Sequence, residues 1–389
     1  MAFNSGAYLR VDGAPPPDPW DAIAGAYLCG DGRWVRLHTN FPHHRDGILK
    51  LLGCANTREA VAAALKNWHA EQFETAATAA GMVVAALRSF GEWDAHPHAP
   101  VIAAQPLLQI ERIGDAPPTP LPLAGQRPLS GMRVLDLTRV LAGPVCGRTL
   151  AAHGADVLRI TGAHLPSLGQ GEIDVGRGKL QAALDLRNEG DQDRLRALVA
   201  DADIFSQGYR PGTLAARGFS PETLAALKPG IVCVSLSAYG WSGPWGGKRG
   251  FDSLVQAATG INMAEAEAFG APENPRPLPC QAIDHATGYL MALGAQACLI
   301  RRAQEGGSWH VRVSLARTGH WLRNLGRLPN GFSVPMPAAA DHPALMETSA
   351  SRFGSLTALR HAGQLSETPP FFTRPAAPLG EHPAAWPSA

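Results

Sequence analysis

Strand-like and helix-like segments alternate through the middle of this chain, and this alternation limits the folds open to it. Six short apolar runs are predicted to be strands: RVLDL (133–137), DVLRI (156–160), LQAALDL (180–186), DIFSQ (203–207), IVCVSLSAYG (231–240) and HVRVSL (310–315). Helical patterns lie between them, the longest in DHATGYLMALGAQACLIRRAQ (284–304). We therefore expect an α/β fold with a doubly wound, largely parallel sheet.

The length of 389 residues predicts more than one lobe, because a single core rarely grows past about 250–300 residues. We expect four parts: a smaller α+β segment (1–113), a proline-rich linker (114–129), a large domain (130–325), and a tail that wraps the surface or is partly irregular (326–389). In the first part, GDGRWVRLH (30–38) predicts a turn and a strand, and EQFETAATAAGMVVAALRSF (71–90) predicts a helix.

Composition excludes several classes of protein. Hydrophobic residues make up 45% of the chain and charged residues 17%, which is too apolar for a disordered chain. The net charge of +1 argues against a strongly basic nucleic-acid binder. No apolar run approaches the roughly 18 residues of a membrane-spanning helix, and no signal-peptide pattern is visible, so we expect a cytoplasmic protein.

Motifs for resident cofactors and metals are also missing. There is no GxGxxG after a strand and no phosphate-binding GxxxxGK[ST], and the six cysteines contain no CxxC pair. The trio His38, His43 and His44 could suggest a metal site, but its spacing fits polar loop residues better. We expect no metal and no permanently bound cofactor.

Asp284 is the main candidate for chemistry. It follows a proline-rich loop and stands at the expected start of the long helix. A helix cap is one interpretation, since aspartate often accepts the unpaired backbone N–H groups there. The other is a nucleophilic or general-base carboxylate held at the positive end of the helix. Position alone favours the cap.

Candidate anion sites lie in three loops. TRVLAGP (138–144) joins a predicted strand to a helix, where ligands of open sheets usually bind. GYRPGTLAARGFSPETL (208–224) offers Arg210 and Arg217, and GPWGGKRGFD (243–252) offers Lys248 and Arg249. The simpler interpretation of each segment is a surface loop with solvated charges. The more specific interpretation is a loop that contacts a bound anion.

Several of these blocks together resemble the class III CoA-transferase (CaiB/BaiF) family, which includes formyl-CoA transferase, carnitine CoA-transferase and α-methylacyl-CoA racemase. The matching segments are GMRVLDLTRVLAGPVCGRTLAAHGADVLRI, GRGKLQAALDLR, DADIFSQGYRPGTLAARGFSPETLAALKPGIVCVSLSAYGWSGPW, RGFDSLVQAATG and the Asp284 segment. Their order and spacing agree with the family's large domain over about 190 residues, and agreement of several independent blocks is more specific than one motif.

The resemblance implies an enzyme that moves CoA between carboxylic acids. Asp284 would attack an acyl-CoA thioester, and the resulting anhydride would become an aspartyl-CoA thioester. Val140, Leu141 and Ala142 match the family's loop at the nucleotide, and Arg249 matches a basic residue near the CoA phosphates. Acyl-CoA and carboxylates would be the substrates, and the family implies a homodimer.

The chain departs from the family's pattern in two ways. A segment like the small domain precedes the large one, an order that a truncated tandem duplication would produce. Where racemases carry a histidine before an aspartate, this chain has Phe251. Phenylalanine cannot move a proton, so an acyl-CoA epimerase is an alternative that this chain resembles less than the transferase. The unusual order suggests a non-catalytic CoA-binding chain as the other alternative.

Overall fold

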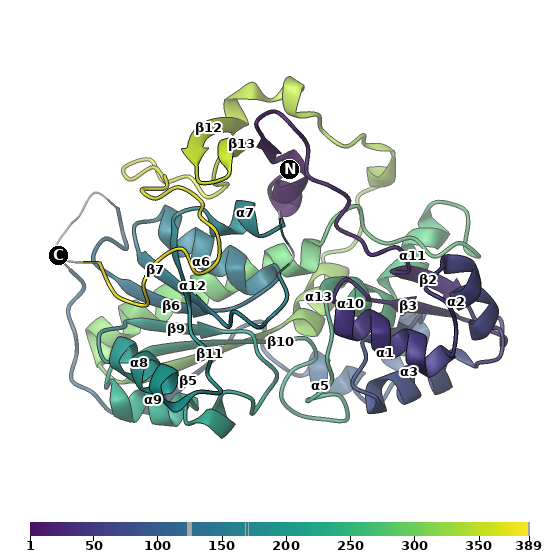
Figure 1. Ribbon diagram of the computed structural model, residues 1–389, viewed down its shortest axis with the longest axis horizontal. Helices are drawn as coiled ribbons and strands as arrows, with labels where there is room; N and C mark the ends of the chain where they lie inside the picture. The colour runs from purple at the N-terminus through teal and green to yellow at the C-terminus, as the bar shows by residue number, and fades with distance from the viewer. Residues whose placement is uncertain (123–126, 168, 170, 388–389) are drawn as a thin grey trace.

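Seven strands form the sheet at the centre of the larger lobe (Figure 1). The structure is a computed structural model that describes residues 1–122, 127–167, 169 and 171–387. In spatial order the strands are β5 (Gln109–Gly114), β11 (Ser308–Ser314), β10 (Val232–Ser237), β9 (Ile204–Gln207), β6 (Arg133–Leu137), β7 (Asp156–Thr161) and β8 (Lys179–Ala183). Neighbours are parallel except β5, which runs antiparallel to β11.

The strand order shows how the sheet is wound. From β6 the chain moves outward to β7 and β8, returns to β9 on the other side of β6, and then moves outward to β10 and β11. The direction of winding reverses between β6 and β9, and ligands of such sheets bind beyond the strands' carboxyl ends at this point. The predicted α/β fold class is confirmed, and each of the six predicted strands overlaps an observed one.

Helices cover both faces of this sheet. α6 (Ala142–Ala152) and α12 (Ala282–Glu305) pack on one face, and α8 (Glu189–Val199) and α9 (Pro221–Leu227) pack on the other. Side chains alternate along a strand, so Val134 and Leu135 belong to different apolar clusters. Within the described residues, no helix is both long enough and apolar enough to cross a bilayer.

The smaller lobe is built on a three-stranded antiparallel sheet with helices on one face. Its elements are β2 (Gly25–Leu28), β3 (Trp34–Leu37), β4 (Val84–Ala86), α1 (Pro42–Leu52), α2 (Arg58–Leu65) and α3 (Ala70–Ala79). The helix predicted over residues 71–90 is wrong beyond residue 79. Gly81 has a left-handed φ of +76°, which ends the helix, and β4 then pairs with β3.

A shared apolar core joins the two lobes. It brings β4 of the smaller lobe against the helices between the lobes: α4 (Phe90–Asp94), α5 (Ala99–Ala103), α10 (Asp252–Ala258), α11 (Ile261–Ala268) and α13 (Leu315–Asn324). Ala85 from β4, Leu254 from α10 and Ile283 from α12 are fully buried in this core. Because side chains from both lobes exclude water together, the lobes are packed as one body.

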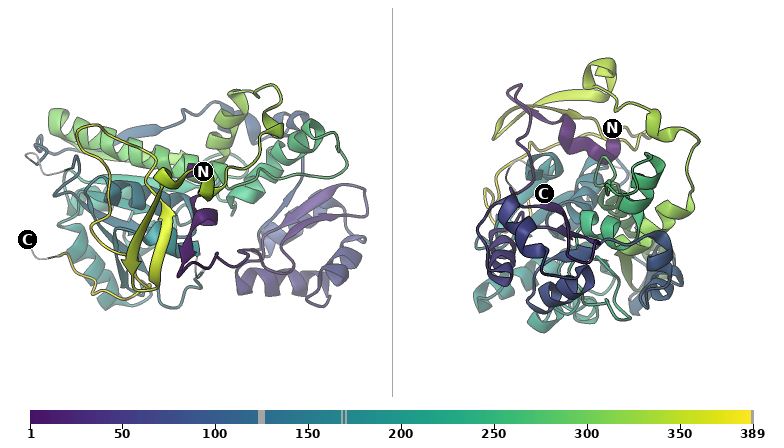
Figure 2. Two further views of the ribbon diagram at one scale, coloured as in Figure 1. Left: turned by 90° about the horizontal axis from the view of Figure 1, so that it is seen from above. Right: turned by 90° about the vertical axis from the view of Figure 1, so that its right-hand side faces the viewer.

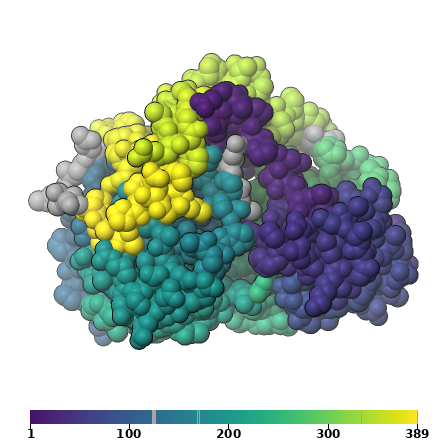
Figure 3. Space-filling model, viewed as in Figure 1, coloured from purple at the N-terminus to yellow at the C-terminus, as the bar shows by residue number. Residues whose placement is uncertain are grey.

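The N-terminal segment pairs with a hairpin of residues 346–359 on the larger lobe. β1 (Arg10–Val11) pairs with β13 (Gly354–Leu359), which forms a hairpin with β12 (Met346–Ser351). Below them, α7 (Gly171–Gly176) contacts the 3₁₀ turn at Ala2–Tyr8. Figure 2 shows the hairpin beside the N-terminal segment, and Figure 3 shows the yellow C-terminal residues spread over the larger lobe.

The division of the chain at residues 113, 129 and 325 stays a proposal. β5 runs across its first boundary and belongs to the large sheet. The expected linker lies partly outside the described residues, at positions 123–126.

A buried ion pair stands at the centre of the larger lobe. The Lys179 ammonium at the start of β8 lies 2.7 Å from Asp136 Oδ2 on β6, and both side chains are inaccessible to solvent. Lys179 also donates a hydrogen bond to the Pro144 carbonyl in α6, and Asp136 accepts one from the Thr138 backbone N–H. A side chain at Gly147 would collide with this pair, so glycine is required there. The pair thus holds two strands, a helix and the loop after β6.

We predict that Lys179→Met lowers the free energy of unfolding by about 3–5 kcal/mol, because it leaves the Asp136 carboxylate buried without its cation. Guanidinium denaturation followed by circular dichroism measures the loss. Lys50→Met, at an exposed position of α1, is the matched control and should change stability by less than about 0.5 kcal/mol. Equal stability of the two variants would contradict this account of the ion pair.

Candidate active site

A cavity of about 470 Å³ opens at the carboxyl ends of the strands, where the winding of the sheet reverses. Its walls come from the segments that follow β6, β7, β8, β9 and β10, and from residues 41–44 of the smaller lobe. The sheet topology places ligand sites here. The predicted site residues all line this cavity: Asp284, Val140, Leu141, Ala142 and Arg249. Their roles stay predictions.

Asp284 lies in the first turn of α12 and lines the cavity. The interpretation of Asp284 as the helix cap is wrong, because Gln281 occupies the cap position. Asp252 from α10 satisfies the start of α12 instead: its Oδ2 accepts a 2.8 Å hydrogen bond from the Asp284 backbone N–H. The Asp284 carboxylate receives no hydrogen bond from the described residues, although the residue is only 7% exposed.

The two aspartates share one electrostatic environment. Burial, and then the charge of Asp252, raises the pKa of Asp284 well above its usual value. Burial also raises the pKa of Asp252 to about 6, although hydrogen bonds from the Asp284 backbone N–H and the Gln256 amide favour its charged form. An ionised Asp284 is therefore poorly solvated, a state in which a carboxylate is more reactive toward an electrophilic carbon.

The loop after β6 brings α6 beside Asp284. Val140 in this loop has a left-handed φ of +71°, which costs a β-branched residue about 1–3 kcal/mol. Gly288 lies one turn beyond Asp284 on the same face of α12, and a side chain there would collide with the Ala142 carbonyl. The close contact of the two helices thus places Ala142 next to Asp284.

Basic side chains dominate another part of the cavity wall: Arg139, Arg187, Arg210, Arg217, Lys248 and Arg249. Arg187 pairs with Asp185, and Lys248 pairs with Glu74. Arg210 and Arg217 form no salt bridge with the described residues, and Arg249 donates a 3.0 Å hydrogen bond to the Gly81 carbonyl. Cations without acidic partners suit a ligand with several negative charges, such as a phosphorylated cofactor.

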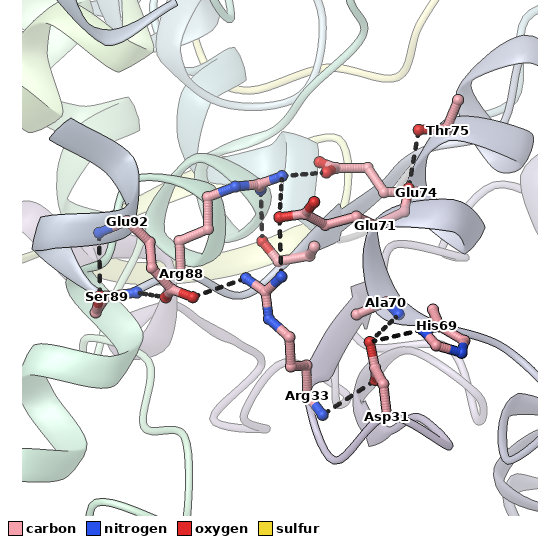
Figure 4. A network of polar contacts seen from close by, with 11 residues as sticks. Asp31, Arg33, His69, Ala70, Glu71, Glu74, Thr75, Arg88, Ser89 and Glu92 are labelled. Atoms are coloured by element: carbon pink, nitrogen blue, oxygen red, sulfur yellow. Dashed lines mark hydrogen bonds and ion pairs between the residues drawn. The ribbon is translucent and has the colours of Figure 1, made fainter. Parts of the chain in front are cut away.

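A buried cluster of charges ties the Arg249 loop to the smaller lobe. Glu74 on α3 is 4% exposed and accepts hydrogen bonds of 2.6 Å from both Lys248 and Arg88. Figure 4 shows the Arg88 guanidinium, from the segment after β4, facing the Glu74 carboxylate on α3. The Lys248 ammonium also lies 3.6 Å from the centre of the Trp245 ring. Because Lys248 directly precedes Arg249, these contacts also hold Arg249 in place at the cavity.

Aromatic rings from both lobes meet at one end of the cavity. His38 stacks on Phe251 with 3.9 Å between ring centres, and Phe41 and His44 flank the same ring. Burial lowers the pKa of both His38 and His44 to about 3, so both are neutral near pH 7. Across the part of the chain that the structure describes, no group of three or more His, Cys, Asp or Glu side chains could hold a metal ion.

Two residues that shape the site were not predicted from the sequence. Asp252 contacts the backbone of Asp284, which is 32 positions away, and no local pattern indicates such a contact. Arg139 reaches the cavity from the loop after β6. Its position directly after a predicted strand, in a loop already considered for ligand binding, was the available signal.

Comparison with known proteins adds to this geometry. Residues 129–345, more than half of the chain, match the model of CoA-transferase family III. The chain belongs to this family. The matched range contains the cavity loops after β6 to β10, together with Arg249 and Asp284.

Three relatives are similar in sequence to parts of this chain. An acetyl-coenzyme A transferase, nodX, from Hypoxylon pulicicidum is 35% identical over 53% of this chain and 35% of its own length. A probable fatty acyl-CoA transferase, Rv3272, from Mycobacterium tuberculosis is 30% identical over 54% of this chain and 58% of its own. An acetyl-CoA:oxalate CoA-transferase from Acetobacter aceti is 32% identical over 50% and 52%.

The chain therefore spans only about a third to three-fifths of the length of these relatives. A crystal structure of Rv3272 from M. tuberculosis matches 51% of this chain and 57% of its own, with 29% identity and a TM-score of 0.48.

We predict that Asp284→Asn stabilises the protein at pH 7.5. The pKa of Asp284 in the folded protein is raised above the ordinary value of 3.8, so its ionisation costs stability as the pH rises through the raised pKa. The neutral amide removes that cost, and the advantage should vanish as the pH falls toward 4. Urea denaturation at several pH values measures it.

Asp115→Asn is the control for this comparison, because the Asp115 side chain is 98% exposed. It should leave the pH dependence of stability close to that of the wild type. A loss of stability in Asp284→Asn at pH 7.5 would contradict the strain assigned to the buried carboxylate.

Proposed function

We propose that this chain transfers CoA between carboxylic acids, with Asp284 as the nucleophile. The observation that carries the proposal is a buried carboxylate with no hydrogen-bond donor among the described residues, in a cavity that also carries several arginines. A nucleophile needs a free lone pair, and CoA needs cations for its phosphates. The names of the family and of the relatives support the same class of reaction.

The proposed reaction divides one exchange into steps that balance. An Asp284 oxygen attacks the thioester carbonyl, the carbon–sulfur bond breaks, and CoA thiolate leaves behind a mixed anhydride. The thiolate attacks the Asp284 carbonyl carbon and releases the donor carboxylate, which leaves an aspartyl-CoA thioester. The acceptor carboxylate repeats these two steps in reverse, so that Asp284 is regenerated and no net proton is consumed. Covalent catalysis of this kind replaces one difficult displacement by easier ones.

We also propose that CoA lies between the loop after β6 and the basic wall. Val140, Leu141 and Ala142 would contact CoA, since the start of α6 presents backbone N–H groups at that loop. Arg249 would bind phosphate, held in place by the Lys248–Glu74 ion pair beside it. The protein would work in the cytoplasm as a homodimer, and light scattering that gave the mass of a single chain would contradict the dimer.

An acyl-CoA epimerase is the weaker alternative. Such an enzyme exchanges the α-proton of the thioester and needs a second group that can move a proton. Phe251 cannot do so, and the neighbouring His38 and His44 have pKa values near 3 and are weak bases. Uptake of deuterium at the α-carbon without CoA exchange would favour this alternative over the transferase.

A trapping experiment tests the nucleophile. The protein is mixed with a panel of acyl-CoA donors, then with hydroxylamine, and the peptide that contains Asp284 is weighed by mass spectrometry. We expect a hydroxamate on Asp284, because both the anhydride and the thioester react with hydroxylamine. Asp284→Asn should give none and should lose at least about 10³-fold in turnover. An unmodified Asp284 in a protein that binds CoA would leave the non-catalytic alternative.

A binding experiment tests the basic wall. We expect Arg249→Ala to weaken CoA binding by at least roughly tenfold, because a charge-assisted hydrogen bond contributes about 1.5–3 kcal/mol. Isothermal titration calorimetry measures the affinity for CoA and for dephospho-CoA. Arg112→Ala, at a half-exposed arginine outside the cavity lining, is the control and should bind CoA like the wild type. Unchanged affinity in Arg249→Ala would remove Arg249 from the site.

A further inference from the structure

The lining of the cavity combines two kinds of side chain. Several arginines line its wall, and apolar side chains of the core between the lobes line it together with Asp284. We propose that the enzyme takes uncharged, apolar acyl groups and discriminates against acyl groups that carry a second carboxylate. The inference rests on the proposed function, because it assumes that the acyl carbon reacts at Asp284.

Apolar residues approach Asp284 from three elements. Ala142 at the start of α6 contacts α12 one turn beyond Asp284. Phe251 directly precedes Asp252, which holds the Asp284 backbone N–H. Leu315 opens α13, which packs on α12 through the hydrogen bond between Thr287 and Thr318. These apolar residues line the cavity and belong to the apolar core between the lobes.

The charge beside Asp284 has the wrong sign for a dicarboxylic acyl group. Asp252 lies against the Asp284 backbone, is fully buried, and is the charged group whose field raises the pKa of Asp284. A second substrate carboxylate bound here would be a third negative charge among apolar side chains. A buried carboxylate without a cation is strongly disfavoured.

Phe41 and His44 contact both the Phe251 ring and arginines of the cavity wall. The Phe251 ring centre lies 6.0 Å from that of Phe41, and the Arg139 guanidinium carbon lies 5.5 Å from the Phe41 ring centre. Arg249 also reaches the rings, with Nη1 at 3.5 Å from His44 Nε2, and the same nitrogen donates a hydrogen bond to the Gly81 carbonyl. The cavity lining thus combines a cationic part, suited to CoA phosphates, with an apolar part, suited to hydrocarbon.

Butyryl-CoA and succinyl-CoA test this proposal, because their acyl groups have the same number of carbon atoms and differ in the terminal carboxylate. We measure kcat/KM for each donor with acetate as the acceptor and also trap Asp284 with hydroxylamine. We expect butyryl-CoA to be preferred by more than about tenfold. Equal values, or a preference for succinyl-CoA, would overturn the proposal and would point to Arg249 as a carboxylate-binding residue. If no donor at all labels Asp284, the proposed function fails instead.

A pair of variants connects the preference to the rings. Phe251→Arg introduces a cation in the apolar part and should shift the ratio of the two kcat/KM values toward succinyl-CoA by about tenfold or more. Phe251→Leu keeps the wall apolar and should retain the preference for butyryl-CoA. Circular dichroism confirms that each variant is folded. If Phe251→Arg does not fold, the donor preference of the wild type and of Phe251→Leu still decides the question.

Discussion

The buried ion pair between Lys179 and Asp136 is the interaction on which the larger lobe depends. It connects the end of β6, the start of β8 and the start of α6, and the segments that follow β6 and β8 carry part of the cavity wall. Because Asp136 also accepts the Thr138 backbone N–H, the pair determines where the loop after β6 begins. A buried ion pair whose polar atoms have hydrogen-bond partners can adopt few other geometries. Apolar packing alone would let the strands and the helix slide past one another. The strained Val140 follows within that loop and is held by it.

The sequence predicted the parts of the fold that depend on neighbouring residues. Short apolar runs predicted β6, β7, β9 and β11 nearly to their ends, since strands buried on both faces are apolar along most of their length. The helix expected over residues 71–90 went wrong because Ala-rich composition hid the turn at Gly81. The pairing of β5 with β11 was not predicted, because nothing within β5 indicates a partner almost two hundred positions away. Long-range pairing depends on the whole fold and not on local propensity.

The site was predicted to a similar degree and for similar reasons. Loops at the carboxyl ends of strands could be identified, and with them Val140 to Ala142 and the arginines of the later loops. The sequence singled out Asp284, which lines the cavity, but its simplest interpretation as a cap was wrong, because another helix supplies the acceptor. Resemblance to a family selected the chemistry, while the structure supplied the surroundings: the second carboxylate, the aromatic rings, and the ion pair behind Arg249.

The pairing of β1 with β13 has a consequence for the order in which the chain can fold. The Ser355 backbone N–H donates a 2.8 Å hydrogen bond to Asp12 Oδ1 across 343 positions. Closing so long a loop costs chain entropy before any contact compensates for it. During synthesis, β1 leaves the ribosome long before β13, whereas all strands of the central sheet are complete at residue 314. The central sheet can therefore form before β1 pairs with β13.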